Sequence, residues 1–188
     1  MKKILALTVL ALLLAASSAL AQGALGTTAP TATVTVNVAT EAALTIQTAA
    51  LTLNQTGSNF ADYTGTTNFT YFIRTAKTGG VGSIVLEVTG DFSAGGGSSP
   101  SVKSPPTSTD FLYYSCTVPS PTSGTATACT GPVNSSTTAS TSVATFGTDA
   151  RSPKAGVSSS VLWGLSNDPL YQTGSYTATV TYTISAVS

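Results

Sequence analysis

The C-terminal stretch "YQTGSYTATVTYTISAVS" alternates strictly. From Tyr176 to Ala186, every second residue is apolar or aromatic, and the residues between them are Thr or Ser. Because successive side chains of an extended strand point to opposite sides, this period predicts a β-strand with one face on a core and one hydroxyl-rich face. A slip of one residue in register would turn Val180, Tyr182 and Ile184 towards water, so the alternation also determines which face is buried.

A second alternation lies near the start of the chain. The stretch "TATVTVNVA", residues 31–39, places Val34, Val36 and Val38 on one face and Thr or Asn on the other. This period predicts the first strand of the chain's own domain. Both termini are then expected to lie within sheets.

Further stretches carry the same signals. Residues 44–53 predict two short strands or one bent strand, and an Ala-rich helix over 41–50 is the less favoured alternative. The residues Ile84, Leu86 and Val88 are expected to face inward. Strands are predicted at 68–75, 83–92, 110–118, 141–148 and 159–166. About eight strands separated by turn signals, with no amphipathic helix, predict an all-β, immunoglobulin-like or Greek-key β-sandwich.

The first 21 residues have the pattern of a signal peptide. Lys2 and Lys3 precede an apolar run from Ile4 to Ala16, which is shorter than a membrane-spanning helix, and Ala19-Leu20-Ala21 fits a cleavage site. Cleavage would leave residues 22–188 as a single domain, beginning with a flexible lead at 22–30. We therefore expect a secreted, periplasmic or cell-surface protein without a membrane span after cleavage.

The charge of the chain is unusually low. Charged residues make up 7% of the sequence, against about a quarter in ordinary globular proteins. Removal of Lys2 and Lys3 leaves five basic residues against seven acidic ones, so the expected net charge is −2. The sequence has no stripe of basic residues, which is the charge pattern that nucleic-acid-binding proteins need to contact phosphates. Solubility must depend on Ser, Thr, Asn and Gln.

The two cysteines, Cys116 and Cys129, are expected to form a disulfide. An even number of cysteines in an exported protein favours this pairing. A redox pair would need closer spacing of the two cysteines, and a metal site would need more ligands. The bridge would close a loop of about 14 residues and stabilise the fold by roughly 3 kcal/mol in the chain-entropy model. The loop is rich in Pro, Ser, Thr and Gly.

Catalytic groups are sparse in this sequence. The chain has no His, which removes the commonest general base and metal ligand. The acidic residues show no spacing typical of a glycosidase pair, and several lie beside turn residues, where Asp caps backbone amides. We predict no catalytic residue, no metal site and no cofactor. A small hydrolase is the least favoured function.

Aromatic side chains are the candidate contact residues. Trp163 and Tyr171 are the two that we select, with Trp163 flanked by Leu162 and Leu165 in a predicted strand. An isolated Trp among apolar neighbours is more often a core residue than a sugar platform. The long loops at 93–109 and 117–140 would carry any such binding surface.

The final stretch, "GSYTATVTYTISA", resembles the closing strand of bacterial secreted β-sandwiches of the pilin-like and spore-coat-like kind. The region "SSVLWGLSNDPLYQTGSYTATVTYTI" is also similar to the end of Gram-positive WxL cell-wall domains, but it lacks the second Trp-x-Leu motif. The resemblance covers the last quarter of the chain and the first strand, and it carries over no binding residue.

The resemblance implies a structural or adhesive role in self-assembly or with other surface subunits. In pilin-like proteins an N-terminal alternating segment can complete the sandwich of the next subunit, and Val34, Val36 and Val38 after the lead would suit that role. The first function hypothesis is therefore a non-catalytic, exported, fimbrial or coat-like subunit. The alternative is a secreted carbohydrate-binding module that uses its long loops.

Overall fold

The structure is a computed structural model that describes residues 32–92 and 98–188. Residues Val38–Ser188 form one compact unit, and the described residues before Val38 belong to another unit. The predicted signal peptide, residues 1–21, and the lead, residues 22–30, lie outside the described residues. Within those residues, no helix is long and apolar enough to cross a membrane.

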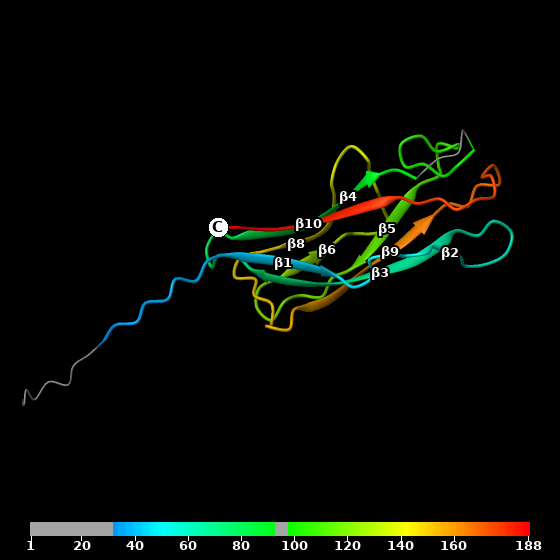
Figure 1. The fold of residues 1–188 in the computed structure, drawn as a ribbon. Helices are drawn as coiled ribbons and strands as arrows, with labels where there is room; N and C mark the ends of the chain where they lie inside the picture. The colour runs from blue at the N-terminus through cyan, green and yellow to red at the C-terminus, as the bar shows by residue number, and fades with distance from the viewer. Residues whose placement is uncertain (1–31, 93–97) are drawn as a thin grey trace, which may run out of the picture. The chain divides into compact units, whose positions relative to one another are not determined.

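The compact unit is an all-β sandwich of two antiparallel sheets, as predicted (Figure 1). The first sheet has the order β1-β3-β9-β5-β7, with β2 paired to β3, and the second has the order β10-β4-β8-β6. The strands are β1 (Glu41–Ile46), β2 (Asn54–Gln55), β3 (Tyr63–Arg74), β4 (Val81–Gly90), β5 (Leu112–Thr117), β6 (Ala126–Ala128), β7 (Val133–Asn134), β8 (Thr141–Phe146), β9 (Val157–Leu165) and β10 (Thr179–Val187).

Each connection from β3 onward passes from one sheet to the other. Strands that are consecutive in the chain therefore face each other across the core instead of pairing side by side. This arrangement accounts for the long Pro- and Gly-rich connections, because a two-residue hairpin cannot bridge two packed sheets. The structure has ten strands where about eight were predicted, and the surplus comes from short pairings such as β2 and β7.

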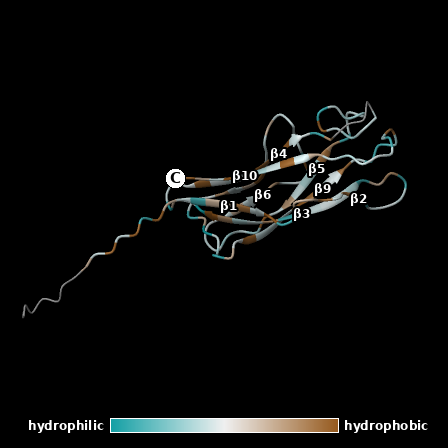
Figure 2. Cartoon of the chain, in the orientation of Figure 1, coloured by the Kyte–Doolittle hydropathy of each residue, from teal (hydrophilic) through white to brown (hydrophobic). Residues whose placement is uncertain are grey.

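The core lies between the sheets, where the inward residues of the long central strands meet. Ile84, Leu86 and Val88 are buried on β4, as their period predicted. Apolar residues are interspersed with pale, weakly polar ones along the strands (Figure 2). The largest fully buried side chains are Phe69, Tyr71, Ile84, Leu86, Val88, Tyr114, Val143 and Val161. Burial of a side chain of this size stabilises the fold by roughly 1.5–3 kcal/mol.

β3 begins earlier than the sequence indicated. The sequence predicted a strand only from residue 68, yet residues 63–67 already continue the ladder with β9. A Cβ on Gly65 would lie 2.9 Å from the side chain of Leu53, and Leu51 lies at 3.0 Å. These two leucines belong to no strand; they cover the glycine instead. The Gly therefore provides space for neighbouring side chains and does not mark a turn.

The predicted first strand is not present in the described residues. Residues 32–40 carry no strand, and the first strand begins at Glu41, opposite Arg74. Val34, Val36 and Val38 are 86%, 76% and 67% exposed. The alternation is real, but a strand also needs a neighbour for its backbone hydrogen bonds, and none pairs with these residues here.

The final strand is confirmed from Thr179 onward, whereas residues 176–178 carry no strand. β10 pairs antiparallel with β4 from Thr179 to Val187, and Val180, Tyr182 and Ile184 point inward. The strand over Glu41–Ile46 likewise excludes the alternative of a helix over 41–50.

Candidate functional site: the unpaired side of the sandwich

One side of the sandwich ends in two strands whose outer edges have no partner. β1 closes the first sheet and β10 closes the second, and among the described residues no strand pairs beyond either of them. The two strands lie close together across the sandwich without pairing. We call this region the open side. Its edges present unpaired backbone N–H and C=O groups, which can accept a further strand.

The inward residues of the open side are only half-buried. β10 alternates between exposed and intermediate residues along its whole length, whereas the neighbouring β4 alternates between intermediate and fully buried ones. Both strands carry similar apolar side chains. The difference arises because β4 has a strand on each side and β10 has one. The half-buried apolar residues are Leu44 and Ile46 on β1, and Val180, Tyr182, Ile184 and Ala186 on β10.

Tyr182 is the largest side chain on the open side. Its ring packs against Phe69, with centroids 6.1 Å apart. Its hydroxyl is buried near the hydrogen bond from Trp163 Nε1 to Thr67 Oγ1 but makes no hydrogen bond of normal geometry to the described residues. Burial raises the pKa of the Tyr182 hydroxyl to about 12. A phenol that remains neutral suits an apolar environment.

The opposite side of the sandwich is closed covalently. Cys116 on β5 and Cys129 just after β6 form the predicted disulfide, with their Cα atoms 5.5 Å apart. β5 belongs to the first sheet and β6 to the second, so the bridge ties the two sheets together. The amide of Cys129 also donates to the carbonyl of Val143, which extends the β6–β8 pairing. The two sheets are therefore linked covalently on this side, whereas the described residues of the open side carry no such link.

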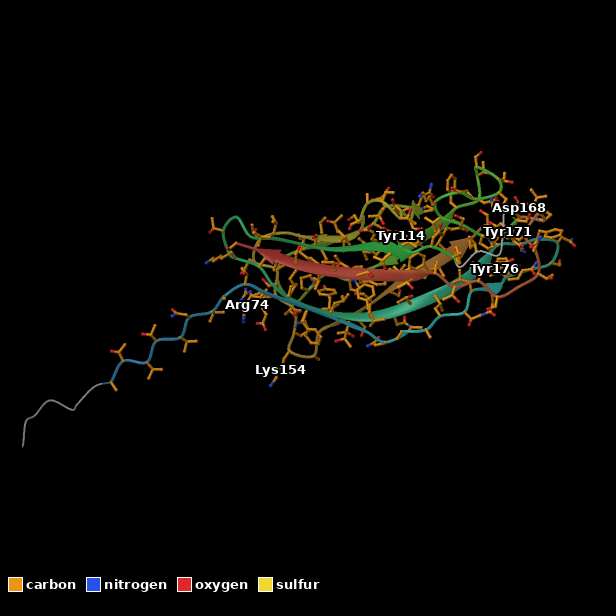
Figure 3. All side chains as sticks on the ribbon, turned by 45° about the horizontal axis from the view of Figure 1, so that its top comes forward. Arg74, Tyr114, Lys154, Asp168, Tyr171 and Tyr176 are labelled. Carbon is orange, nitrogen blue, oxygen red and sulfur yellow. A yellow bond between two sulfur atoms is a disulfide. The ribbon has the colours of Figure 1, made fainter. Side chains whose placement is uncertain are left out.

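The end of the sandwich where β9 finishes holds a second cluster, made of loops. Tyr171, Tyr176 and Asp168 lie together there, far from Arg74 at the other end (Figure 3). The hydroxyl of Thr107 donates to Asp168, and the amide of Leu170 donates to its other oxygen at 2.7 Å. The loop containing 98–110 is thus tied to the connection between β9 and β10.

Asp110 and Asp168 form a carboxyl pair in this cluster. Burial, followed by the neighbouring Asp168, raises the pKa of Asp110, which is 7% exposed. The hydrogen bond from the Thr107 hydroxyl, followed by that from the Leu170 amide, lowers the pKa of Asp168. Burial raises the pKa of Tyr171 well above its usual range. Asp110 therefore keeps its proton to a higher pH than Asp168 does.

The structure places the selected aromatic residues in different environments. Trp163 is 4% exposed and belongs to the core, so it offers no face to a ligand. Tyr171 is partly exposed in the loop cluster. These two candidate contacts are therefore not brought together. Within the described residues, no group of three or more His, Cys, Asp or Glu side chains could hold a metal ion.

Sequence reasoning missed two features. The pairing of Asp110 with Asp168 joins residues far apart in the chain, and only turn signals marked either one. The contacts of Arg74 with Ala39 and Glu41 were also missed, although Arg74 and Glu41 are both charged in a chain with little charge. Because charged residues are so few in this chain, the presence of both Arg74 and Glu41 was the signal that could have indicated this ion pair.

No protein-family model matches this chain, and comparisons with curated proteins and with solved structures also gave no match.

Proposed function

We propose that this protein is a non-catalytic, exported structural subunit that assembles by strand addition at the open side. The observation that carries this proposal is the contrast between β10 and β4, which have similar apolar faces but different burial. A strand added beside β10 would pair its free edge and cover its half-buried row. The signal-peptide pattern and the hydroxyl-rich, weakly charged surface support a periplasmic or cell-surface location.

The fold is asymmetric in a way that suits assembly. The disulfide links the two sheets on the side of β5 and β6, whereas the two long edges without a partner among the described residues, β1 and β10, lie on the other side. Natural sheets usually protect free edges with charges, Pro or bulges. β10 has neither a charged residue nor Pro between Thr179 and Val187, and its one irregularity lies at Thr179/Val180. An unprotected edge of this length favours pairing with another chain.

Assembly can be tested on the protein from residue 22 onward. Size-exclusion chromatography with light scattering and electron microscopy should show a ladder of oligomers or filaments. Deletion of residues 22–37, which leaves the compact unit intact, should abolish the ladder if this segment supplies the added strand. A wild-type protein that stays monomeric at all concentrations tested would contradict the proposal.

A second candidate function is carbohydrate binding by the loop cluster. The observation that favours it is the grouping of Tyr171, Tyr176 and the Asp110–Asp168 pair at one end of the sandwich. Aromatic faces and carboxylates are the usual contacts for sugar rings and hydroxyls. Binding to a glycan array by a monomer, lost in Tyr171→Ala, would support this function over assembly.

A further inference from the structure

We infer that the outer face of the first sheet carries a binding platform for an uncharged, β-linked polysaccharide, centred on the ring of Tyr113. This face points away from the core and extends over β3, β9 and β5, which are neighbours in the sheet (Figure 1). It does not include the open side, so the inference is independent of assembly there. It also uses none of the residues of the loop cluster, which was the second candidate site.

Three large apolar or aromatic side chains share this outer face. On β5, the residues on either side of Tyr113 are buried, so Tyr113 itself points outward. Phe111 lies two residues earlier, on the same face by the period of two, and is 42% exposed. On the neighbouring β9, Leu162 is 49% exposed and lies opposite Ser115, which shares the face of Tyr113. We call Phe111, Tyr113 and Leu162 the outer row.

The ring of Tyr113 lies across the sheet instead of standing out from it. A Cβ built on Gly164, its partner on β9, would be 2.2 Å from the ring carbon Cζ and 2.4 Å from Cε2. The ring therefore covers the backbone of Gly164 with one face and turns the other face towards solvent, in keeping with its partial exposure. Because residue 164 has no side chain, the sheet can present a flat aromatic surface at this point.

A hydrogen bond to Asp62 fixes the orientation of this ring. The Tyr113 hydroxyl donates to Asp62 Oδ2 at 2.9 Å. Burial, followed by the hydrogen bond and the charge of Asp62, raises the pKa of the Tyr113 hydroxyl, so the phenol stays neutral and remains a donor. A side chain that is already held in one orientation loses little conformational freedom when a ligand packs on it. The aromatic surface is therefore preorganised.

The strands around the outer row carry almost no charge. β2, β5, β7 and β9 contain no charged residue, and Arg74 pairs with Glu41 at the far end of β3 and β1. A phosphate or a nucleic acid would therefore find no basic residue beside the outer row. A basic peptide would find the carboxylate of Asp62, which already accepts a hydrogen bond from Tyr113. The charge pattern of this face favours an uncharged ligand.

Hydroxyl groups border the outer row on both sides. On β3, Thr64 lies opposite Gly164 and Thr66 lies opposite Leu162, and on β5 Ser115 lies on the other side of Leu162. A sugar ring has flat C–H faces, which can stack on an aromatic face, and a rim of hydroxyls, which exchange hydrogen bonds with Ser and Thr. The outer row and its borders therefore match the two kinds of surface that a neutral sugar ring presents.

The shape of the platform favours an extended chain of sugars. The three side chains of the outer row lie along the face of a sheet and do not enclose a pocket, so a ligand must lie flat on them. A β-linked chain is extended and can contact the row along its length, whereas a coiled α-linked chain would contact it with one ring. A protein partner would need roughly 20–30 residues a side around a continuous apolar centre, and this row is interrupted by hydroxyls.

Binding can be measured on the protein from residue 22 onward, by its depletion from solution onto insoluble polysaccharides. Microcrystalline cellulose and chitin are the probes for extended β-linked chains, and starch granules are the probe for coiled α-linked chains. Wild type should bind cellulose, chitin or both, but not starch. Binding to only one of the two β-linked polymers would support the inference and identify the sugar.

Substitutions place the site on the outer face. Tyr113→Ala should weaken binding by about tenfold, because it removes the stacking surface. Leu162→Ser changes an exposed side chain, so it should leave the midpoint of urea denaturation unchanged and weaken binding by about fivefold. The matched control is Val81→Ser, which changes a 53% exposed apolar residue of the second sheet and should bind like wild type. If Tyr113→Ala does not fold, Leu162→Ser and its control decide the test.

Several outcomes would overturn the inference. Wild type that binds neither cellulose nor chitin, or that binds starch equally well, would contradict it and would leave the proposed assembly at the open side untouched. Equal binding by Leu162→Ser and Val81→Ser would show that the outer row does not hold the ligand. If Tyr171→Ala abolishes binding and Leu162→Ser does not weaken it, the sugar binds at the loop cluster instead.

Discussion

The aromatic ring of Tyr113 lies directly over Gly164, its partner on the neighbouring strand. A Cβ built on Gly164 would lie 2.2 Å from the Tyr113 ring, and the Tyr113 hydroxyl donates to Asp62 Oδ2 at 2.9 Å. The absence of a side chain at 164 thus allows one tyrosine to connect β5, β9 and the segment before β3. Close approach of this kind is a usual reason for Gly within a strand.

Gly164→Ala should therefore destabilise the protein by about 1–3 kcal/mol through overpacking. Urea denaturation measures the loss. In the double variant with Tyr113→Ala, the added methyl group has room, so the two changes should be clearly non-additive. Additive losses would show that the ring does not occupy this space.

Thr67→Val should destabilise the core by about 1–3 kcal/mol, because the buried Nε1 of Trp163 would lose its acceptor at 3.0 Å. The matched control is Thr66→Val. Thr66 is the preceding residue on β3 and points to the exposed face, so this change should have little effect on the midpoint of denaturation. Equal losses in the two variants would contradict the role of the hydrogen bond.

Asp91 and Asp110 should respond to substitution in opposite ways at neutral pH. Burial acts to raise the pKa of Asp91, but hydrogen bonds from the Val102, Lys103 and Phe92 amides and the Ser101 hydroxyl outweigh it, so this pKa is lowered. Asp91→Asn removes acceptors from these donors and should cost about 1–3 kcal/mol at pH 7. Asp110→Asn replaces a carboxyl whose charge is unfavourable in the folded state, and it should be neutral or stabilising.

The pH dependence of these two substitutions follows from linkage. A lowered pKa contributes stability above the ordinary value of 3.8, and that stability is lost as the pH falls through the folded-state value, so the deficit of Asp91→Asn should shrink in acid. A raised pKa favours folding below 3.8 and opposes it as the pH rises through the folded-state value, so any gain from Asp110→Asn should appear only above that range. Urea denaturation from pH 2 to 7 tests both signs. A deficit of Asp91→Asn that persists in acid would contradict the assignment.

Loss of the disulfide should cost about 3 kcal/mol, as expected for a bridge whose cysteines are 13 residues apart. Replacement of Cys116 and Cys129 together by Ser, followed by thermal denaturation, measures this loss. Reduced wild type serves as the control and should match the double variant. The inward row of the open side lies away from the bridge, so the oligomers that form at low temperature should persist in the variant.

The fold class and the final strand could be predicted because alternation is a property of the chain itself. On β4 and β10, the choice of which residues face inward depends only on the period of two and on the chemistry of the side chains. The same period of two predicted a strand at 31–39 that the described residues 32–40 do not form, and it did not indicate residues 63–67 as part of a strand. In both cases the deciding factor was a neighbour: the described residues 32–40 pair with nothing, whereas Gly65 is covered by Leu51 and Leu53.

By itself, the sequence determined the two-sheet architecture, the disulfide and the inward faces of the long strands. Only the tertiary structure decided which edges remain unpaired, that β10 is half-buried, and that Arg74 holds the chain at Ala39. The physical reason is that a residue's face follows from its immediate neighbours in the chain, whereas hydrogen-bond pairing and burial depend on groups that only folding brings together.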